Sequence, residues 1–293
     1  MAEACTPGSQ GRRTLFRGLG LGVDDFRCRA HAATHGDEEP NPTHSIVFVR
    51  RGVFARTHRG DTLVADANQV LFFNQAQPYR YSHPVAGGDD CTIVTLEPAT
   101  AVAAVARFDP RVGEHPETPF RVGHAPSTPR IARLHLECLT ALHAAPGSLA
   151  GEDLLAELVD ETLRVSQGSL ATSAGPGPRR AERPGAASRR REMVERVKLV
   201  LNERFESPPA LEELAALVEC SPFHLSRIFR SVTGLGLRHY LRRLRARLAA
   251  DRLGRHAGDL TGLALDLGFY DHSHFTRSFH REWGVPPSRL WKR

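Results

Sequence analysis

The stretches Ser-Pro-Phe-His-Leu-Ser-Arg-Ile-Phe (221–229) and Asp-His-Ser-His-Phe-Thr-Arg-Ser-Phe (271–279) decide the fold of the C-terminal part of this chain. Each begins with Ser221 or Asp271, a residue type whose side-chain oxygen can accept a hydrogen bond from a free backbone N–H of a helix. Apolar residues follow at helical spacing, and each stretch leaves one arginine, Arg227 or Arg277, off the apolar stripe. The repetition predicts two matched amphipathic helices with similar outer faces.

A shorter apolar-periodic segment precedes each of these helices, as a helix-turn-helix requires. The sequence therefore predicts two such units, at 209–233 and 260–284, joined by a helix over 237–253. At about 1.5 Å per residue this joining helix is about 25 Å long, so it would hold the two units at a fixed separation. If that separation is near one turn of DNA, about 34 Å, one chain could read two successive major-groove segments.

The outward faces of the two predicted recognition helices carry side chains suited to DNA. Arginine can bind a guanine edge bidentately, serine and threonine are adaptable, and phenylalanine can contact a thymine methyl. The predicted base-reading residues are Phe223, Ser226, Arg227, Arg230, His272, Ser273, Thr276 and Arg277. On the joining helix, Arg242 and Arg243 are predicted to contact phosphates, which orient a protein on DNA without specifying sequence. The alternative is two packed helical hairpins with solvated arginines, which the duplication makes the weaker interpretation.

Charge is distributed unevenly between the two halves. Residues 1–178 carry a net charge of −4 and residues 179–293 a net charge of +10, giving the +6 of the whole chain. A basic half joined to a mildly acidic one is typical of a nucleic-acid module attached to another domain.

The N-terminal half reads as β structure followed by helices. Short β-branched and aromatic runs at 45–50, 53–58, 69–74, 77–83 and 92–97 are separated by glycine-rich turns, which predicts a small antiparallel barrel or sandwich. Helical periodicity follows at 99–108, 130–145 and 149–167. Residues 168–188 concentrate Gly, Pro, Ser and Ala, which predicts a flexible linker. We therefore expect a sensor and dimerisation domain at 20–167 and a helical domain at 189–293.

The strings Ser221–Arg230, Thr233-Gly234, Gly268–Phe279 and Gly284–Ser288 resemble the DNA-binding domain of AraC/XylS-type transcriptional regulators. The resemblance covers roughly the last third of the chain. It implies a bacterial regulator, base contacts at the positions named above except Arg230, double-stranded DNA as partner, and contact with RNA polymerase. The expected mode of regulation is activation, whereas a homodimer and the existence of a small-molecule effector are left open. Glu219 and Gly262 depart from what such turns and helices prefer, so we expect each to cost on the order of 1 kcal/mol of stability.

The β segment resembles the cupin-like sensor domain of such regulators, through His44–Gly52 and Pro78–Pro84. The expected fold class is thus α+β, with an N-terminal cupin-like β-barrel and accessory helices, then an all-α domain of two helix-turn-helix units. Tyr79, Tyr81 and His83 share one face of a predicted strand at period two. Together with His31 they are the predicted effector-binding residues.

Two other functions compete with sequence-specific regulation. A metal-dependent cupin enzyme would use His31, His35, His44 and His83, with Cys28 or Cys91, but the β segment lacks the paired His-x-His of such enzymes. We therefore expect no catalytic residues, no metal and no cofactor. Non-specific nucleoid binding would predict an affinity that is insensitive to DNA sequence.

Five scattered cysteines without a C-x-x-C pair argue against a disulfide framework and a zinc finger, and fit a reducing cytoplasm. No stretch approaches the about 20 apolar residues of a membrane span. We expect a cytoplasmic protein without a membrane partner.

Overall fold

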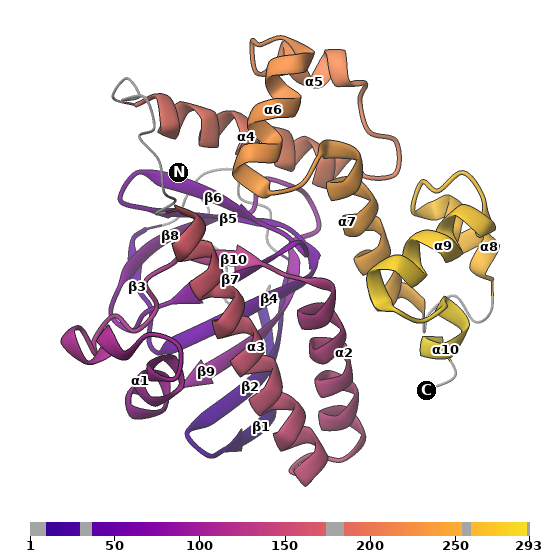
Figure 1. Ribbon diagram of the computed structural model, residues 1–293. Coiled ribbons are helices and arrows are strands. Elements are labelled where there is room, and N and C mark those ends of the chain that lie inside the picture. Colours follow the sequence, from indigo (N-terminus) through magenta and orange to yellow (C-terminus); the bar gives the residue numbers. More distant parts are fainter. Residues whose placement is uncertain (1–9, 30–36, 174–184, 254–258, 292–293) are drawn as a thin grey trace.

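The computed structural model describes residues 10–29, 37–173, 185–253 and 259–291 (Figure 1). Its strands are β1 Gln10–Gly18, β2 Leu21–Cys28, β3 Glu39–Pro40, β4 His44–Gly52, β5 Phe54–His58, β6 Asp61–Ala65, β7 Gln69–Phe73, β8 Pro78–Ser82, β9 Asp89–Leu96 and β10 His124–Pro126. They form a six-stranded sheet, β1-β2-β9-β4-β7-β10, and a four-stranded sheet, β3-β8-β5-β6. The described pairings in both sheets are antiparallel.

The six-stranded sheet is the middle layer of the N-terminal domain. Its inner face packs on the four-stranded sheet through an apolar cluster that includes Val47, Leu71, Phe73 and Tyr79. Its other face carries Ile46, Phe48, Val70 and Phe72, which pack against helices in a second cluster. Alternate residues of one strand therefore enter two different cores, as the two-residue period of a strand requires. The predicted β domain is confirmed, as two facing sheets.

The helices are α1 Pro98–Ala106, α2 Pro129–Ala144, α3 Leu149–Ser173, α4 Ala186–Glu203, α5 Leu211–Leu217, α6 Pro222–Thr233, α7 Leu237–Arg252, α8 Leu260–Asp266, α9 His272–Trp283 and α10 Pro287–Trp291, with a 3-10 turn, η2, at Pro110–Glu114. Helices α1–α3 cover the outer face of the six-stranded sheet, and α4–α10 form the basic C-terminal part (Figure 1). Every predicted helix is present within a few residues of its expected ends.

The structure differs from the expectations at three places. Strand structure begins well before residue 20, because β1 covers Gln10–Gly18 and a two-residue turn at Leu19 and Gly20, with φ of 55° and 70°, joins it to β2 in a hairpin in which Gly18 pairs with Leu21. Strand β6 was also not predicted. The helices reach into both ends of the segment expected as a linker, since α3 continues to Ser173 and α4 begins at Ala186; residues 174–184 lie outside the described residues.

Among the described residues, none of the helices has the length and apolar character that crossing a membrane would require.

Candidate nucleic-acid interface

The two helix-turn-helix units share the same local frame. Helices α6 and α9 are each 12 residues long. Ser221 Oγ accepts a hydrogen bond from His224 N at 3.2 Å, and Asp271 Oδ1 accepts one from His274 N at 2.6 Å. Both helices end at a left-handed glycine, Gly234 or Gly284, whose N–H donates to the carbonyl four residues earlier. The two stretches of sequence therefore form the matched helices that their caps predict.

The turn between the two helices of each unit needs a residue with positive φ. Glu219 has φ 54° in the first unit, and Gly268 has φ 74° in the second. The left-handed conformation costs a residue with a Cβ about 1–2 kcal/mol. The expected strain at Glu219 is therefore present at its backbone. Gly262 leaves room for the cap of α8, because a Cβ there would lie 2.3 Å from Asp259 Oδ2.

Each recognition helix is anchored to the joining helix α7 by an aromatic side chain. Phe229 of α6 packs edge-on against Tyr240, with ring centroids 5.2 Å apart. Trp283 of α9 donates from Nε1 to Ala246 O at 2.9 Å. Leu225, Phe229, Phe275 and Phe279 are fully buried beneath the two units. These contacts fix both recognition helices on one rigid support.

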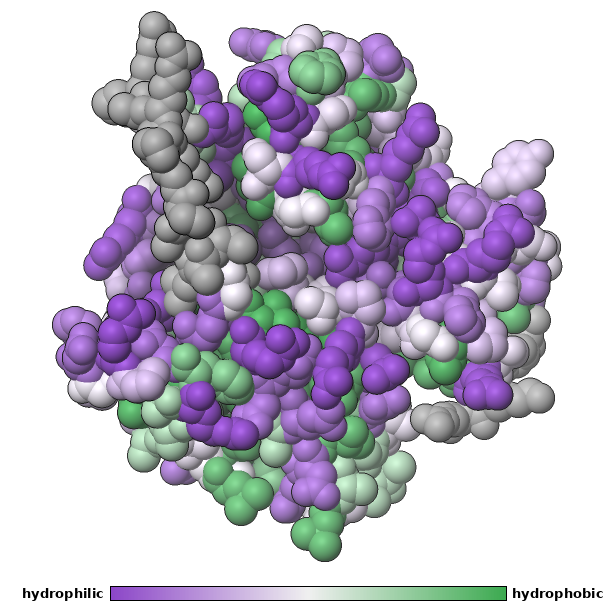
Figure 2. All heavy atoms as spheres, in the orientation of Figure 1, coloured by the Kyte–Doolittle hydropathy of each residue, from purple (hydrophilic) through white to green (hydrophobic). Residues whose placement is uncertain are grey.

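The predicted reading residues lie on the accessible side of this support. Phe223 is 79% exposed although it is a large apolar residue, so its ring is available to a partner. The exposed members of the predicted set are Phe223, Arg227, Arg230, His272, Ser273 and Arg277, and the half-buried ones are Ser226 and Thr276. Polar side chains dominate the C-terminal part on the face drawn in Figure 2. The two outer faces thus offer the donors and the apolar contact that base edges require.

The two arginines predicted to contact phosphates lie in different surroundings on the joining helix. Arg243 is buried, donates through Nη2 to Ser127 O and pairs with Glu282. It points into the contact with the N-terminal domain, so it does not face phosphates in this structure. Arg242 remains half-buried at the surface; burial, and then the neighbouring charge of Arg281, lower its pKa.

The contact between the two domains is polar and buried. The turn after β6 places Asp66 where it accepts hydrogen bonds from the Tyr240 hydroxyl and, at 2.8 Å, from Asn202 Nδ2. Lys198 Nζ donates to Val64 O at 2.6 Å, and Arg247 donates to Ala67 O. Burial raises the pKa of Tyr240, as does the charge of Asp66. We call this contact the interdomain seam.

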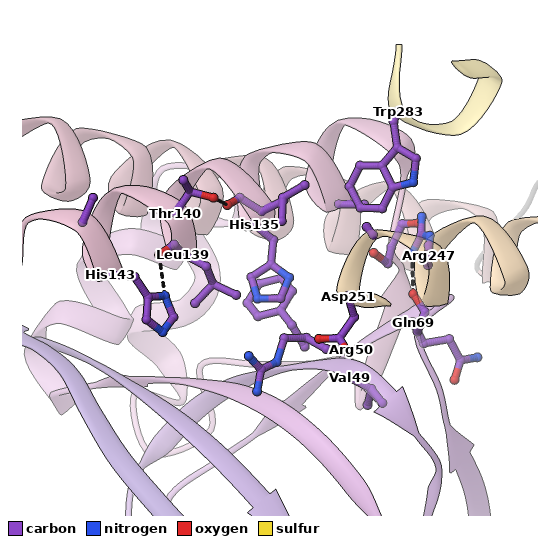
Figure 3. A pocket seen from close by; sticks show the side chains of 17 residues that line it. Val49, Arg50, Gln69, His135, Leu139, Thr140, His143, Arg247, Asp251 and Trp283 are labelled. Atoms are coloured by element: carbon purple, nitrogen blue, oxygen red, sulfur yellow. Dashed lines mark hydrogen bonds between the residues drawn. The ribbon is translucent and has the colours of Figure 1, made fainter. Parts of the chain in front are cut away.

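A cavity of about 600 Å³ opens beside the seam (Figure 3). Its walls come from both domains: β4 contributes Arg50, α2 contributes His135 and His143, α7 contributes Arg247, and α9 contributes Trp283. Arg50 Nε is buried and has no hydrogen-bond partner. Burial, with the charges of Arg50 and Arg247, lowers the pKa of His135 to about 3, so this imidazole is neutral at pH 7. The cavity therefore combines apolar walls with one unpartnered N–H donor, because the Arg50 guanidinium already forms an ion pair with Asp25 through Nη2.

The structure separates the predicted effector residues from this cavity. Tyr79 is 2% exposed and packs between the sheets, where its hydroxyl donates to Gln77 Oε1 at 3.0 Å. Tyr81 lies near it, with ring centroids 6.3 Å apart. His83 Nε2 lies 2.8 Å from Asp89 Oδ1, and His31 lies outside the described residues. The shared face of Tyr79 and Tyr81 is confirmed, but it is packed interior rather than an open cavity.

Sequence reasoning missed several residues. Tyr270 lies just before the cap of α9 and is 88% exposed. Its position in the sequence could have identified it, because an exposed aromatic side chain next to a recognition helix is available for contact. No feature of the sequence identifies the contact of Arg247 with Glu282 and Ser127. These partners lie far from Arg247 along the chain, and local periodicity does not reveal their burial.

The comparisons with known proteins agree with this geometry. The helix-turn-helix domain family matches residues 214–293. The regulatory protein SoxS of Salmonella typhimurium is 33% identical over 88 residues, which are 30% of this chain and 82% of that protein. The transcriptional activator RhaR of Klebsiella pneumoniae is 30% identical over 171 residues, covering 58% of this chain and only 55% of that one.

Among solved structures, an AraC-type transcriptional regulator from Chromobacterium violaceum matches 38% of this chain and 95% of its own, with 21% identity and a TM-score of 0.32. ToxT from Vibrio cholerae matches 97% of this chain and 98% of its own, with 10% identity and a TM-score of 0.34. The residues that match the helix-turn-helix family, 214–293, contain both recognition helices and the helix that joins them. On this evidence the chain belongs to the AraC/XylS family of DNA-binding transcriptional regulators.

Proposed function

We propose that the chain reads two adjacent major-groove segments of double-stranded DNA, one with α6 and one with α9. The observation that carries the proposal is the pair of capped, rigidly supported helices whose outer faces expose Arg227 and Arg277. The remaining exposed residues differ between the two faces. The two segments should therefore differ in sequence rather than form a palindrome.

The finer roles are proposals as well. A relative described as a transcriptional activator supports activation. RNA polymerase as a partner and the cytoplasm as the place of action belong to the same proposal. The facing sheets support a cupin-like barrel as the sensor domain, with the link between the domains lying between α3 and α4. A homodimer through the N-terminal domain is compatible with this arrangement.

The test uses a duplex that the wild-type chain selects from a randomised DNA pool. Replacing Arg227 or Arg277 by alanine should weaken binding by about 1–3 kcal/mol, because each guanidinium can bind one guanine edge. Binding titrations on duplexes with single base-pair changes should show that each variant loses discrimination at its own base pair.

The matched control is Arg80→Ala. It removes the same charge from an exposed position of β8, in the other domain. It should leave affinity and discrimination unchanged. Equal losses by the two recognition variants on selected and random DNA would contradict specific reading and favour non-specific binding.

We further propose that a small molecule in the interdomain cavity controls DNA binding. Since both domains line the cavity, a ligand there would bind only their docked arrangement and so shift the population toward it. The unpartnered Nε–H of Arg50 favours a mostly apolar compound with a hydrogen-bond-accepting group. The apolar anion anilinonaphthalene sulfonate should bind the native chain with a gain in fluorescence. The cavity-filling variant Leu139→Trp should abolish that gain, and an equal gain in the variant would contradict the proposal.

A further inference from the structure

A thiol, an imidazole and a carboxylate meet where the two sheets join, among residues that do not line the interdomain cavity. Cys28 ends β2 and Asp89 begins β9, and the ladder places these two residues directly opposite each other. His83 follows β8 of the other sheet. The three potential ligand atoms, one from each side chain, all lie within 4.8 Å of one another.

The backbone holds this group in place and shields it from solvent. Cys28 is fully buried, Asp89 is 2% exposed, and the His83 side chain is 12% exposed. Gly88 has φ +66°, and a Cβ there would lie 2.0 Å from Cys28 O. Glycine therefore permits the β8–β9 connection to lie directly against the end of β2, which brings His83 and Asp89 to Cys28.

Asp89 differs from its neighbouring carboxylates in its partners. Asp24, Asp25 and Asp90 each form an ion pair with at least one arginine. Within the described part of the chain, the recorded side-chain partners of Asp89 are His83 Nε2 at 2.8 Å and Cys91 Sγ at 2.9 Å. A buried carboxylate is costly unless a cation compensates it. Among the described residues Asp89 therefore forms no ion pair with an arginine, although it is more buried than Asp25 and Asp90.

The donor set identifies the class of cation. Zinc prefers thiolate, imidazole and carboxylate ligands at about 2.0–2.3 Å, which puts neighbouring ligand atoms about 3–4 Å apart. Small rotations of these side chains would reach that spacing from the present one. Calcium and magnesium take oxygen ligands instead.

We propose that Cys28, His83 and Asp89 bind one divalent transition-metal ion of the zinc type. The Cys91 thiol donates to the second oxygen of Asp89 and so orients the carboxylate. Binding displaces the proton of the Cys28 thiol and any proton shared by His83 and Asp89. The ion would link the two sheets, because His83 follows the four-stranded sheet whereas Cys28 and Asp89 belong to the six-stranded sheet.

The experiment is a titration of the full-length chain with Co²⁺, after its metal is removed with a chelator. We expect one equivalent to bind, with a thiolate-to-cobalt charge-transfer band in the near ultraviolet, and Zn²⁺ to displace it. The absence of this band would overturn the proposal, because cobalt bound by histidines elsewhere has no thiolate ligand.

Variants locate the site. Cys28→Ser should abolish the charge-transfer band, and Cys91→Ser should weaken Co²⁺ binding by about 10–100-fold. The matched control is Cys138→Ser, which changes a buried thiol in α2 and should leave the band unchanged. Asp89→Asn keeps the side-chain shape but should lose binding, and it serves if Cys28→Ser does not fold by circular dichroism. If folded Cys28→Ser or Asp89→Asn kept the full affinity for Co²⁺, the proposal would be wrong, and His83 and Asp89 would form only an ion pair with each other.

Discussion

The two helix-turn-helix units have one frame but different attachments to the N-terminal domain. In the first unit, the residues that dock on that domain lie beside the recognition helix, on α4 and α7, as Lys198 and Tyr240 do. In the second unit the recognition helix itself takes part, because Glu282 of α9 accepts hydrogen bonds from Arg243 and Arg247. Both arginines also donate to Ser127 O of the N-terminal domain.

This difference shows how duplicated units can be controlled separately. A movement at the interdomain seam would reach α9 through Glu282, whereas it would reach α6 only through α4 and α7. The two units should therefore respond differently to substitutions at the seam and in their turns.

The largest effect is expected from Glu282→Gln. It leaves two buried guanidinium groups without their carboxylate, since the side chains of Arg243 and Arg247 are 9% and 4% exposed. The free energy of unfolding should fall by about 3–5 kcal/mol, measured by urea denaturation. Arg281→Gln, one position away and exposed, should change it by less than about 0.5 kcal/mol. Equal effects of the two substitutions would show that Glu282 does not hold the seam.

The next largest effect is expected from Gly268→Ala in the turn of the second unit. A Cβ there would lie 2.1 Å from Glu206 O, and φ is +74°, so the variant suffers both a clash and backbone strain. We expect a loss of about 2–3 kcal/mol in urea denaturation. Gly234→Ala is the matched control, because its φ is +73° but no atom lies within 4 Å of the added Cβ. It should lose only about 1 kcal/mol, and equal losses would exclude the contact with Glu206 as a cause.

The sequence predicted the local features well and the long-range ones poorly. Caps, stripes and the positive φ at Glu219 depend on neighbouring residues, so they follow from residue type and spacing. The sequence predicts a phosphate contact for Arg243, whereas the structure pairs it with Ser127 and Glu282, which are distant along the chain. The hairpin of β1 and β2 was missed because its turn places a leucine, Leu19, at positive φ, where glycine or asparagine is the usual signal.

A smaller effect separates the two neighbouring arginines of α7. Arg242→Ala should reduce the slope of log affinity against log salt concentration by about 1, since one phosphate contact is lost. Burial and then the charge of Arg281 lower the pKa of Arg242, and a phosphate there would offset the second of these causes. Arg243→Ala should leave the slope unchanged and lower stability instead. Affinity measured between low and physiological salt tests this, and an unchanged slope in Arg242→Ala would place α7 away from the DNA backbone.

The smallest effect has the opposite sign and arises in the turn of the first unit. Glu219 occupies the position of Gly268, at φ 54°, where a Cβ costs about 1–2 kcal/mol. Glycine removes that strain but loses about 0.5–1 kcal/mol of stability through the greater freedom of the unfolded chain. Glu219→Gly should therefore stabilise the protein by up to about 1 kcal/mol, measured as a higher urea midpoint. Glu219→Ala keeps the Cβ and removes the charge, so it should give no such gain; a gain of equal size in both variants would mean that charge rather than backbone conformation sets the stability of this turn.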